Sequence, residues 1–276
     1  MKTFRQVING RSVAAVSGKT LIVEDPSTMV KIAAVPHSGK ADVDAAVAAA
    51  AAAFPAWSAT TPGERSLALL RLADALEAKR STFVRAESEN AGKPISAVGL
   101  EVDAVVDNLR YFAGAARNME GKAAAEYLPG RTSLIRRDPV GVVASIAPWN
   151  YPLLMASWKL GPALAAGNTV VLKPASWTPL TAVRFGELCL EAGLPAGVVN
   201  VVTGPGGSAG ARLAAHPGVG KIGFTGETAT GQEIMRLAAG NIKKVSLELG
   251  GKSPNIVFAD ADVERFAAES PYSVFD

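Results

Sequence analysis

A glutamate at the end of a segment of alternating apolar and polar residues is a candidate for catalysis. Residues 245–249 alternate apolar and polar side chains, which is the period of a strand with one apolar face, and they run into Gly250-Gly251. Glu248 therefore stands at the carboxyl end of an expected strand, beside a turn where backbone can pass close to a ligand. Ligands of open α/β sheets bind outside such strand ends, and a carboxylate there can act as a general base. The alternative is a rim glutamate held in a structural salt bridge.

Two glycine-rich loops could hold phosphate groups. Residues 204–209 follow an expected strand, open an expected helix and fit the dinucleotide-binding pattern G-x-G-x-x-A. They follow the third strand rather than the first, and no acidic residue follows at the expected spacing, so a plain glycine turn is the alternative. Residues 226–231 have the spacing of an ATP-binding loop, but Gln232 replaces the required lysine, which excludes an ATPase. Both loops present backbone N–H groups at helix starts, which suits a pyrophosphate.

Regular elements must position these candidates, and from residue 140 onward the hydrophobic pattern alternates between strand and helix. The expected strands are 140–146, 169–172, 198–203, 221–225 and 243–249, and the expected helices between them are 153–166, 178–193, 208–215 and 228–239. This alternation predicts an α/β fold with a doubly wound, mostly parallel five-stranded sheet of the Rossmann-like kind. The loops that follow the strands are then the expected ligand sites.

The first part of the chain is expected to support the sheet and to contribute no catalytic residues. Short β-like runs within residues 6–35 indicate an antiparallel meander. The expected helices are 42–54, which Pro55 would end, a helix that starts at Thr61-Pro62 with Leu67, Leu70 and Leu76 on one stripe, and 95–119. We expect these helices to cover one face of the sheet.

Composition excludes several classes of function. The 276 residues carry a net charge of +3 with acidic and basic side chains intermixed, so we expect no nucleic-acid partner. The single cysteine excludes an intrachain disulfide and a cysteine-based zinc site, and the two histidines stand apart, so we expect no metal. Pro148, Asn150 and Pro152 interrupt the apolar segment 140–158, so we expect no membrane span. The first ten residues lack the apolar region of a signal peptide, which predicts a cytoplasmic protein.

Four short motifs share an order and a spacing that point to one family. They are Pro148-Trp149-Asn150-Tyr151-Pro152, Lys173-Pro174-Ala175, Phe224-Thr225-Gly226 and Glu248-Leu249-Gly250-Gly251-Lys252. Together they resemble the NAD(P)-dependent aldehyde dehydrogenase superfamily over essentially the whole chain. Within that superfamily, the sequence resembles the betaine-aldehyde and aminobutyraldehyde branch most. The resemblance implies an oxidoreductase that converts a small aldehyde, in that branch an aminoaldehyde, to the acid with NAD. It also implies full-length relatives that are homo-oligomers.

The resemblance assigns roles to individual residues. The side-chain amide of Asn150 would donate to the oxyanion formed from the substrate, Glu248 would activate a water, and Lys159 would stand near Glu248 on a proton path. A fixed donor of this kind is worth roughly 10²–10³ in rate. Lys173 would bind the adenosine ribose. Ser176 stands where the family often has a carboxylate that would repel a 2′-phosphate, so both NAD and NADP stay possible as the cofactor. The other residues expected in the cofactor cleft are Pro148, Trp149, Gly206, Gly226, Glu227, Gly231, Leu249 and Gly250.

The resemblance also divides the chain into parts. Residues 1–121 are expected to form the meander and helices of the cofactor domain, 122–137 a protruding hairpin, 138–251 the dinucleotide-binding sheet, and 252–276 the start of a truncated catalytic domain. In the last part we expect a strand over 255–259 and a helix over 263–275 whose apolar side chains lack packing partners. Such exposed apolar surface predicts a partner-dependent or aggregation-prone chain. The side chains concerned are Val257, Phe258, Phe266, Tyr272 and Phe275.

One part of the family pattern is missing from this sequence. The nucleophile of the family is a cysteine in a Gly-Gln-x-Cys segment after the general base, and no cysteine follows Glu248. Cys189 lies among Phe185, Leu188 and Leu190 in an expected buried helix, where a thiol is inert. We therefore expect a chain that is inactive alone. The alternatives are a non-catalytic cofactor-binding subunit and one half of a split enzyme.

Overall fold

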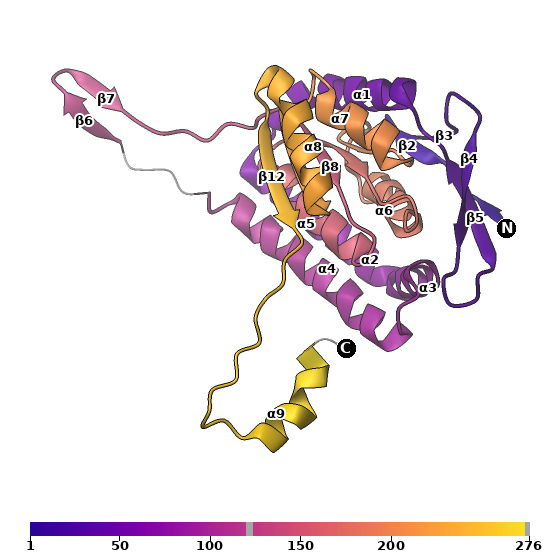
Figure 1. Cartoon of the computed structure of the whole chain (residues 1–276). Helices are drawn as coiled ribbons and strands as arrows, with labels where there is room; N and C mark the ends of the chain where they lie inside the picture. Colours follow the sequence, from indigo (N-terminus) through magenta and orange to yellow (C-terminus); the bar gives the residue numbers. More distant parts are fainter. Residues whose placement is uncertain (120–123, 274–276) are drawn as a thin grey trace.

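The computed structural model describes residues 1–119 and 124–273 and is built on a seven-stranded sheet (Figure 1). Five strands run parallel in the spatial order β12-β11-β8-β9-β10. They are β8 (Val142–Ile146), β9 (Thr169–Lys173), β10 (Val199–Val201), β11 (Lys221–Gly226) and β12 (Lys244–Leu249). The doubly wound α/β fold is confirmed. The sheet is larger than the five strands expected, because β2 (Gln6–Ile8) and β3 (Arg11–Val13) extend it antiparallel beyond β10.

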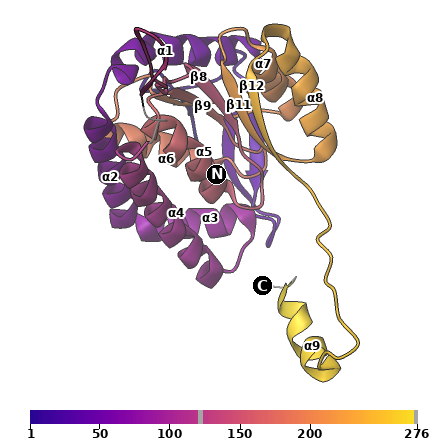
Figure 2. The ribbon, with the colours of Figure 1, turned by 90° about the vertical axis from the view of Figure 1, so that its left-hand side faces the viewer.

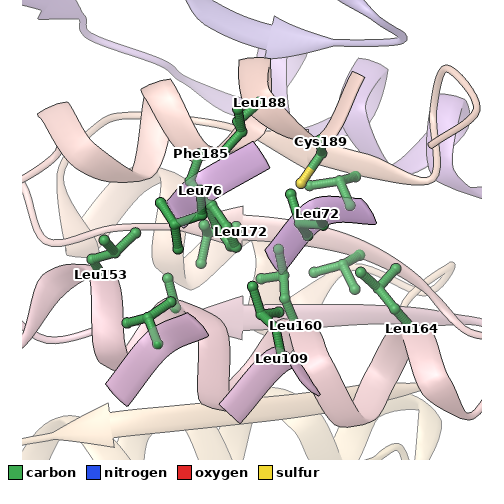
Figure 3. Close-up of a cluster of buried hydrophobic side chains, with 14 of the residues drawn as sticks. Leu72, Leu76, Leu109, Leu153, Leu160, Leu164, Leu172, Phe185, Leu188 and Cys189 are labelled. Atoms are coloured by element: carbon green, nitrogen blue, oxygen red, sulfur yellow. The ribbon is translucent and has the colours of Figure 1, made fainter. Parts of the chain in front are cut away.

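Helices cover both faces of this sheet (Figure 2). On one face lie α2 (Pro62–Ala78), α3 (Arg80–Ala91), α4 (Ile95–Ala116), α5 (Pro152–Ala165) and α6 (Leu180–Glu191), and on the other lie α1 (Lys40–Ser58), α7 (Ala211–Ala215) and α8 (Thr228–Ala238). Strand side chains alternate between faces, so Leu172 of β9 joins the first core cluster (Figure 3) and Val171 joins the second. Because both faces are covered, every residue of β8 and β9 is buried.

The N-terminal strands do not form the single antiparallel meander that we expected. β1 (Lys2–Thr3), β5 (Lys31–Pro36) and β4 (Thr20–Glu24) make a small sheet with β1 and β5 parallel, whereas β2 and β3 join the large sheet. The carboxylate of Asp42, at the start of α1, accepts hydrogen bonds from Gln6 Nε2 at 2.7 Å and from the backbone N–H groups of Val16 and Gly39 at 2.9 Å. These contacts hold β2 against the start of α1. The hydrophobic period of the sequence does not reveal contacts between segments so far apart.

The boundary between α1 and α2 is displaced from the one expected at Pro55. α1 continues through this proline to Ser58, and Trp57 is 4% exposed in the core. A proline inside a helix removes one backbone hydrogen bond, and we attribute the continuation to the burial of Trp57. The start of α2 is confirmed, since Thr61 Oγ1 accepts from the Glu64 N–H while the Glu64 carboxylate accepts from the Thr61 N–H at 2.7 Å.

The buried stripe of α2 is also displaced from the one expected. Leu67 and Leu70 are exposed, whereas Leu69, Leu72 and Leu76 are buried in the core cluster. Both sets have helical spacing, so periodicity alone did not separate them. Packing against α4 and α5 decides which set faces inward.

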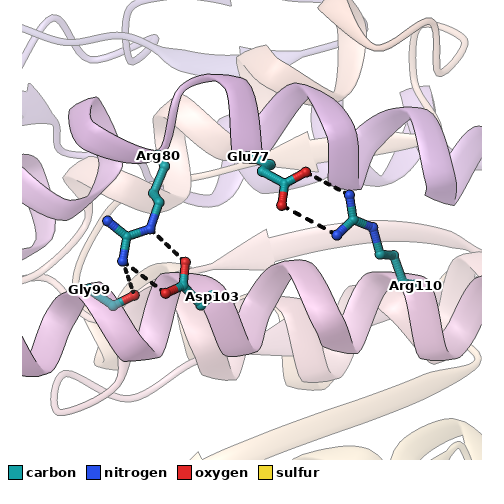
Figure 4. A network of polar contacts seen from close by, with 5 residues as sticks. All are labelled: Glu77, Arg80, Gly99, Asp103 and Arg110. Atoms are coloured by element: carbon teal, nitrogen blue, oxygen red, sulfur yellow. Dashed lines mark hydrogen bonds and ion pairs between the residues drawn. The ribbon is translucent and has the colours of Figure 1, made fainter.

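Polar contacts on the outer side of α2, α3 and α4 connect these helices (Figure 4). Arg80 Nε lies 2.6 Å from Asp103 Oδ1, and its Nη2 donates to the carbonyl oxygen of Gly99 at 3.0 Å. Arg110 Nη2 lies 2.7 Å from Glu77 Oε2. All four charged side chains are substantially exposed, so water screens both ion pairs and they contribute little to stability. The apolar core, rather than this network, holds the helices in place.

Two segments extend away from the body of the protein in Figure 1. They are the hairpin of β6 (Ala125–Leu128) and β7 (Arg131–Ser133), and the end with α9 (Val263–Glu269) and the 3-10 turn η3 (Ser270–Ser273). The strand expected over 255–259 is wrong, since among the described residues no strand pairs with that segment. Val257, Phe258 and Tyr272 are exposed as expected, Phe266 is partly buried, and Phe275 lies outside the described residues. Within the described ranges, no helix is long and apolar enough to cross a membrane.

Replacing Leu160, which is fully buried in α5, with alanine should lower the free energy of unfolding by about 2–5 kcal/mol. The loss has two sources, the apolar surface removed and the cavity left in the core. Leu100→Ala is the matched control, because Leu100 is 73% exposed on α4, and it should change the value by no more than about 0.5 kcal/mol. Urea denaturation followed by circular dichroism measures both, and equal effects would contradict this core assignment.

Candidate functional site

The carboxyl ends of the parallel strands open into one cleft of about 1750 Å³. Its walls come from the loops after β8, β9, β11 and β12, from α5, and from the starts of α8 and of the π-helical turn η1 (Gly206–Gly210). The cleft also extends along α5 to residues at the amino ends of the strands, among them Asn168, Lys221 and Lys244. Every residue that the sequence proposes for catalysis or cofactor binding lines this cleft, except Gly231. The lining residues among them are Pro148, Trp149, Asn150, Lys159, Lys173, Ser176, Gly206, Gly226, Glu227, Glu248, Leu249 and Gly250.

Asn150 lies in the turn between β8 and α5 and is exposed to the cleft. Pro148 and Pro152 restrict the backbone on either side of it, and Pro152 is the first residue of α5. Within the described part of the chain, no group hydrogen-bonds the side-chain amide of Asn150. The amide N–H groups can therefore meet a ligand without first breaking a bond to the protein.

Lys159, Thr225 and Glu248 share the face of the sheet that α5 covers. Thr225 and Glu248 are paired in the parallel register of β11 and β12, while the preceding residues, Phe224 and Leu247, pack on the opposite face. Lys159 Nζ, from α5, donates a hydrogen bond to Thr225 Oγ1 at 2.6 Å. Burial lowers the pKa of Lys159 to about 8, and the Glu248 carboxylate opposes that shift. A lysine that titrates near neutrality thus stands close to a cleft carboxylate.

Lys173 ends β9 and stands on the opposite face of the sheet, which it shares with Val171. Its Nζ donates to the carbonyl oxygen of Pro174 at 2.7 Å, and a Cβ placed on Gly210 would lie 3.6 Å from its Cδ. Burial lowers the pKa of Lys173 to about 8. An ammonium group has three donors, and among the described residues Pro174 is its acceptor, so two donors remain for a ligand.

Ser176 connects two of the cleft loops. Its Oγ donates a hydrogen bond to the carbonyl oxygen of Gly204 at 3.0 Å, which ties the loop after β9 to the glycine loop after β10. Gly204 has φ +146°, and a Cβ there would lie 2.8 Å from the carbonyl oxygen of Ser38, so the position admits only glycine. The hydroxyl hydrogen of Ser176 is therefore used within the protein, and the oxygen can still accept from a ligand.

The two helical segments that begin at the cleft lack side-chain caps. Glu227 precedes α8 and Pro205 precedes η1, and neither makes a side-chain hydrogen bond to its helix. Most other described helices also begin without such a bond, and the exceptions are α2, capped by Thr61, and α9, capped by Asp262. Uncapped first-turn N–H groups carry partial positive charge, and together with the ammonium of Lys173 they suit phosphate oxygens. The donor set of the cleft therefore fits a dinucleotide.

Gly231 is the predicted cofactor residue that does not line the cleft. It is buried within α8, where an added Cβ would lie 2.7 Å from Leu249 Cδ2. Its lack of a side chain allows α8 to pack closely against β12. Of the two glycines that bound the segment 226–231, Gly226 lines the cleft together with Glu227, Ala229 and Thr230, whereas Gly231 is buried on the side of α8 that faces Leu249.

Thr225 lines the cleft, and the motif Phe224-Thr225-Gly226 assigned it no role. The available signal is the period of its strand, because Thr225 has the parity of Lys221 and Gly223 and so faces α5. Its hydrogen bond to Lys159 joins segments 66 residues apart. The partner therefore becomes visible only in the folded protein.

Cys189 lies in α6, is 1% exposed, and belongs to the core cluster of Figure 3 rather than to the cleft. Burial raises the pKa of its thiol to about 12, so the reactive thiolate is scarce at neutral pH. Cys189 thus has neither the position nor the ionisation of a nucleophile for this cleft. Among the described residues, no group of three or more histidine, cysteine, aspartate and glutamate side chains could hold a metal ion.

Comparisons with known proteins agree on one family. The family model described as "Aldehyde dehydrogenase family" matches residues 13–276. Phenylacetaldehyde dehydrogenase of Pseudomonas fluorescens is 49% identical over 280 residues, with 98% of this chain and 56% of the relative covered. Betaine aldehyde dehydrogenase of Bacillus subtilis is 42% identical over 270 residues, with 97% and 55% covered.

Solved structures lead to the same family. PnpE, known from Pseudomonas sp. WBC-3 and solved in complex with nicotinamide adenine dinucleotide, is 47% identical and superposes with a TM-score of 0.95. The match covers 100% of this chain and 56% of PnpE. The chain thus spans about half the length of the relatives it matches.

Cys189 should not react with a thiol reagent such as 5,5′-dithiobis(2-nitrobenzoate) while the chain is folded. A thiolate must attack the disulfide of the reagent and release 2-nitro-5-thiobenzoate, and this thiol is buried with a pKa of about 12. After unfolding in guanidinium chloride the same assay should detect one thiol per chain, which serves as the internal control. Rapid labelling under native conditions would show that Cys189 is accessible and would contradict its exclusion as the nucleophile.

Proposed function

The chain belongs to the aldehyde dehydrogenase family, and from that premise we propose that its cleft binds a nicotinamide dinucleotide next to an aldehyde that the whole protein oxidises to the acid. One observation carries this proposal. The cleft crosses the edge of the sheet, with Lys173 on the face of α7 and the group of Lys159, Thr225 and Glu248 on the face of α5. A dinucleotide has two ends joined by a pyrophosphate, so it can reach both faces at once.

The binding half of the proposal rests on the polar groups of the cleft. Lys173 would donate to the hydroxyls of the adenosine ribose, and the uncapped starts of η1 and α8 would hold the pyrophosphate. Trp149 and Leu249 offer apolar surface within the same cleft. NAD is the cofactor we propose. Because Ser176 carries no charge to repel a 2′-phosphate, NADP is expected to bind as well.

The chemical half concerns what the side chains do to protons and charge. A bound nicotinamide would supply the hydride acceptor. The side-chain amide of Asn150 would donate to the substrate oxygen as negative charge develops there, with little reorganisation because its turn lies between two prolines. The carboxylate of Glu248 would take a proton from the attacking water. Lys159, held by Thr225, would stabilise that carboxylate and offer a route for the proton.

The nucleophile of the family reaction is not proposed for any residue of this chain. Cys189 is buried in α6, away from the cleft. The 276 residues by themselves should therefore bind cofactor without forming NADH from aldehydes. For the substrate we propose an organic aldehyde, with an aminoaldehyde as the narrower candidate, because both phenylacetaldehyde and betaine-aldehyde dehydrogenases are relatives.

Lys173→Met should weaken NAD binding by roughly 10- to 100-fold, since it removes charge-assisted hydrogen bonds to the ribose. The pKa of Lys173 is about 8 in the free protein, so it is charged below that pH and loses its proton above it. Wild-type affinity should accordingly fall from pH 7 to pH 9, and Lys173→Met should lack most of that fall. Isothermal titration calorimetry with NAD and with NADP measures both effects.

Two controls sharpen this measurement. Lys31→Met removes an exposed lysine of β5 and should leave affinity and pH profile unchanged. Lys159→Met tests the second lysine that titrates near pH 8 and should retain most of the affinity at pH 7. Wild-type binding that is absent, or indifferent to Lys173→Met, would count against the proposed function.

Glu248→Gln should reduce aldehyde oxidation by roughly 10²–10⁴-fold, the usual contribution of a general base. The assay needs a cysteine at the cleft, so residues 1–250 are joined to the remaining part of the Pseudomonas fluorescens phenylacetaldehyde dehydrogenase, and NADH is followed by absorbance with phenylacetaldehyde. Glu233→Gln is the matched control, since Glu233 is a cleft carboxylate paired with the exposed Arg236 one helical turn away, and it should change the rate by less than about twofold. A chimera that binds NAD but oxidises nothing, or a fully active Glu248→Gln variant, would refute the proposed role.

A further inference from the structure

The turn that carries Asn150 is held by a helix from elsewhere in the chain. Tyr151, the residue before α5, makes no side-chain hydrogen bond to that helix. Instead Glu87, in α3, reaches the first turn of α5, where its Oε1 accepts the backbone N–H of Leu153 at 2.9 Å. Its other oxygen accepts the hydroxyl of Thr181 on α6. A buried side chain of α3, 2% exposed, thus takes the place of a local cap.

A second contact from the same region reaches the residue after Asn150. Lys93 lies in the turn between α3 and α4, and its Nζ stands 3.5 Å from the centroid of the Tyr151 ring. The lysine is also paired with Glu101 on α4, and both side chains are less than 20% exposed. A cation in contact with a ring face, when partly desolvated, contributes more than at an open surface. Lys93 therefore contacts the side chain of Tyr151, whereas Glu87 contacts the backbone at Leu153.

We propose that Glu87 and Lys93 are positioning residues that hold the turn 148–152, so that the amide of Asn150 is presented to the cleft in one orientation. This inference rests on the proposed function, in which Asn150 donates to a developing oxyanion. Donors of this kind are effective when their orientation is set before charge develops. Both contacts are made directly after Asn150: Glu87 binds the backbone N–H of Leu153 in α5, and Lys93 contacts the ring of Tyr151.

The choice of residue supports a role beyond filling space. Burial raises the pKa of Glu87 to about 7, against the hydrogen bonds from Thr181 and Leu153 and the charge of Lys93, whereas Glu101 adds to the rise. An apolar side chain would avoid this desolvation cost. Both ionisation states can hold the turn, since the neutral acid accepts from Leu153 with one oxygen and donates to Thr181 with the other. Glutamine reproduces that neutral pattern, which makes it the conservative variant.

The test uses the full 276-residue chain without nucleotide and reads the turn directly. Hydrogen exchange of the Leu153 amide reports the Glu87 contact. The fluorine resonance of 5-fluorotryptophan at Trp149, assigned with Trp149→Phe among the four tryptophans, reports the turn itself. Glu87→Ala should speed Leu153 exchange at least about tenfold and shift or broaden the Trp149 line, because a buried donor has lost its acceptor. Lys93→Met should move the Trp149 line while Leu153 stays protected.

Conservative and neighbouring variants separate positioning from general stability. Glu87→Gln should stay within about twofold of the wild type for exchange and keep the Trp149 line, because it preserves both hydrogen bonds. Glu89→Ala, an exposed position on the same helix, should change neither readout. Should Glu87→Ala fail to fold, Thr181→Val loosens the same carboxyl group and should speed Leu153 exchange severalfold.

Two results would overturn the proposal. One is unchanged Leu153 exchange and an unchanged Trp149 line in a folded Glu87→Ala or Thr181→Val variant. The other is a Glu87→Gln variant as impaired as Glu87→Ala. Titrating wild type with NAD keeps the two proposals apart, since absent NAD binding with intact protection of Leu153 counts against the function alone.

Discussion

The alternation of side chains along parallel strands is the constraint on which this site depends. β8 and β9 are buried on both faces, so a polar side chain within them has no water to meet. Polar groups gather where the strands stop, and successive strand residues there point to opposite faces. Lys173 therefore stands on the face of α7, while Thr225 and Glu248 stand on that of α5. Because side chains alternate along each strand, the two sides of the cleft carry different polar groups.

That same period explains how much of the site could be predicted from the sequence. The ends of the strands are visible as apolar runs that meet glycine or proline, and this places Lys173, Glu248 and the glycine loops at one edge. Gly231 was predicted in the cleft but does not line it, because a spacing of glycines does not tell which of them face a ligand site and which make room for a neighbouring element. In the structure Gly231 makes room for Leu249. Sequence spacing identified the loop, and packing sorted its members.

Elements fixed by distant contacts were predicted less well. β2 pairs with β10 in the large sheet, where Val7 is buried, and α1 passes through Pro55 where Trp57 is buried. The stripe of α2 was misassigned because Leu67 and Leu69 both fit a helical period. In each case a local rule competes with burial against another part of the chain, and burial determines the outcome. A single sequence carries the local rule but not the partner.

The partners of the site residues show the same division, and they also limit what the cleft can do. Lys159 binds Thr225 across 66 positions, and Glu87 binds the start of α5 across 66 positions as well. These bonds hold Lys159 and the start of α5 in place before any ligand arrives, and the proposed function needs such an arrangement to stabilise developing charge. None of them supplies a nucleophile, and the thiol of Cys189 is held in the core by the same close packing that orients α6. Under the proposed function, the groups that line the cleft would bind a dinucleotide and stabilise developing charge, whereas Cys189, buried in the core, would take no part in either.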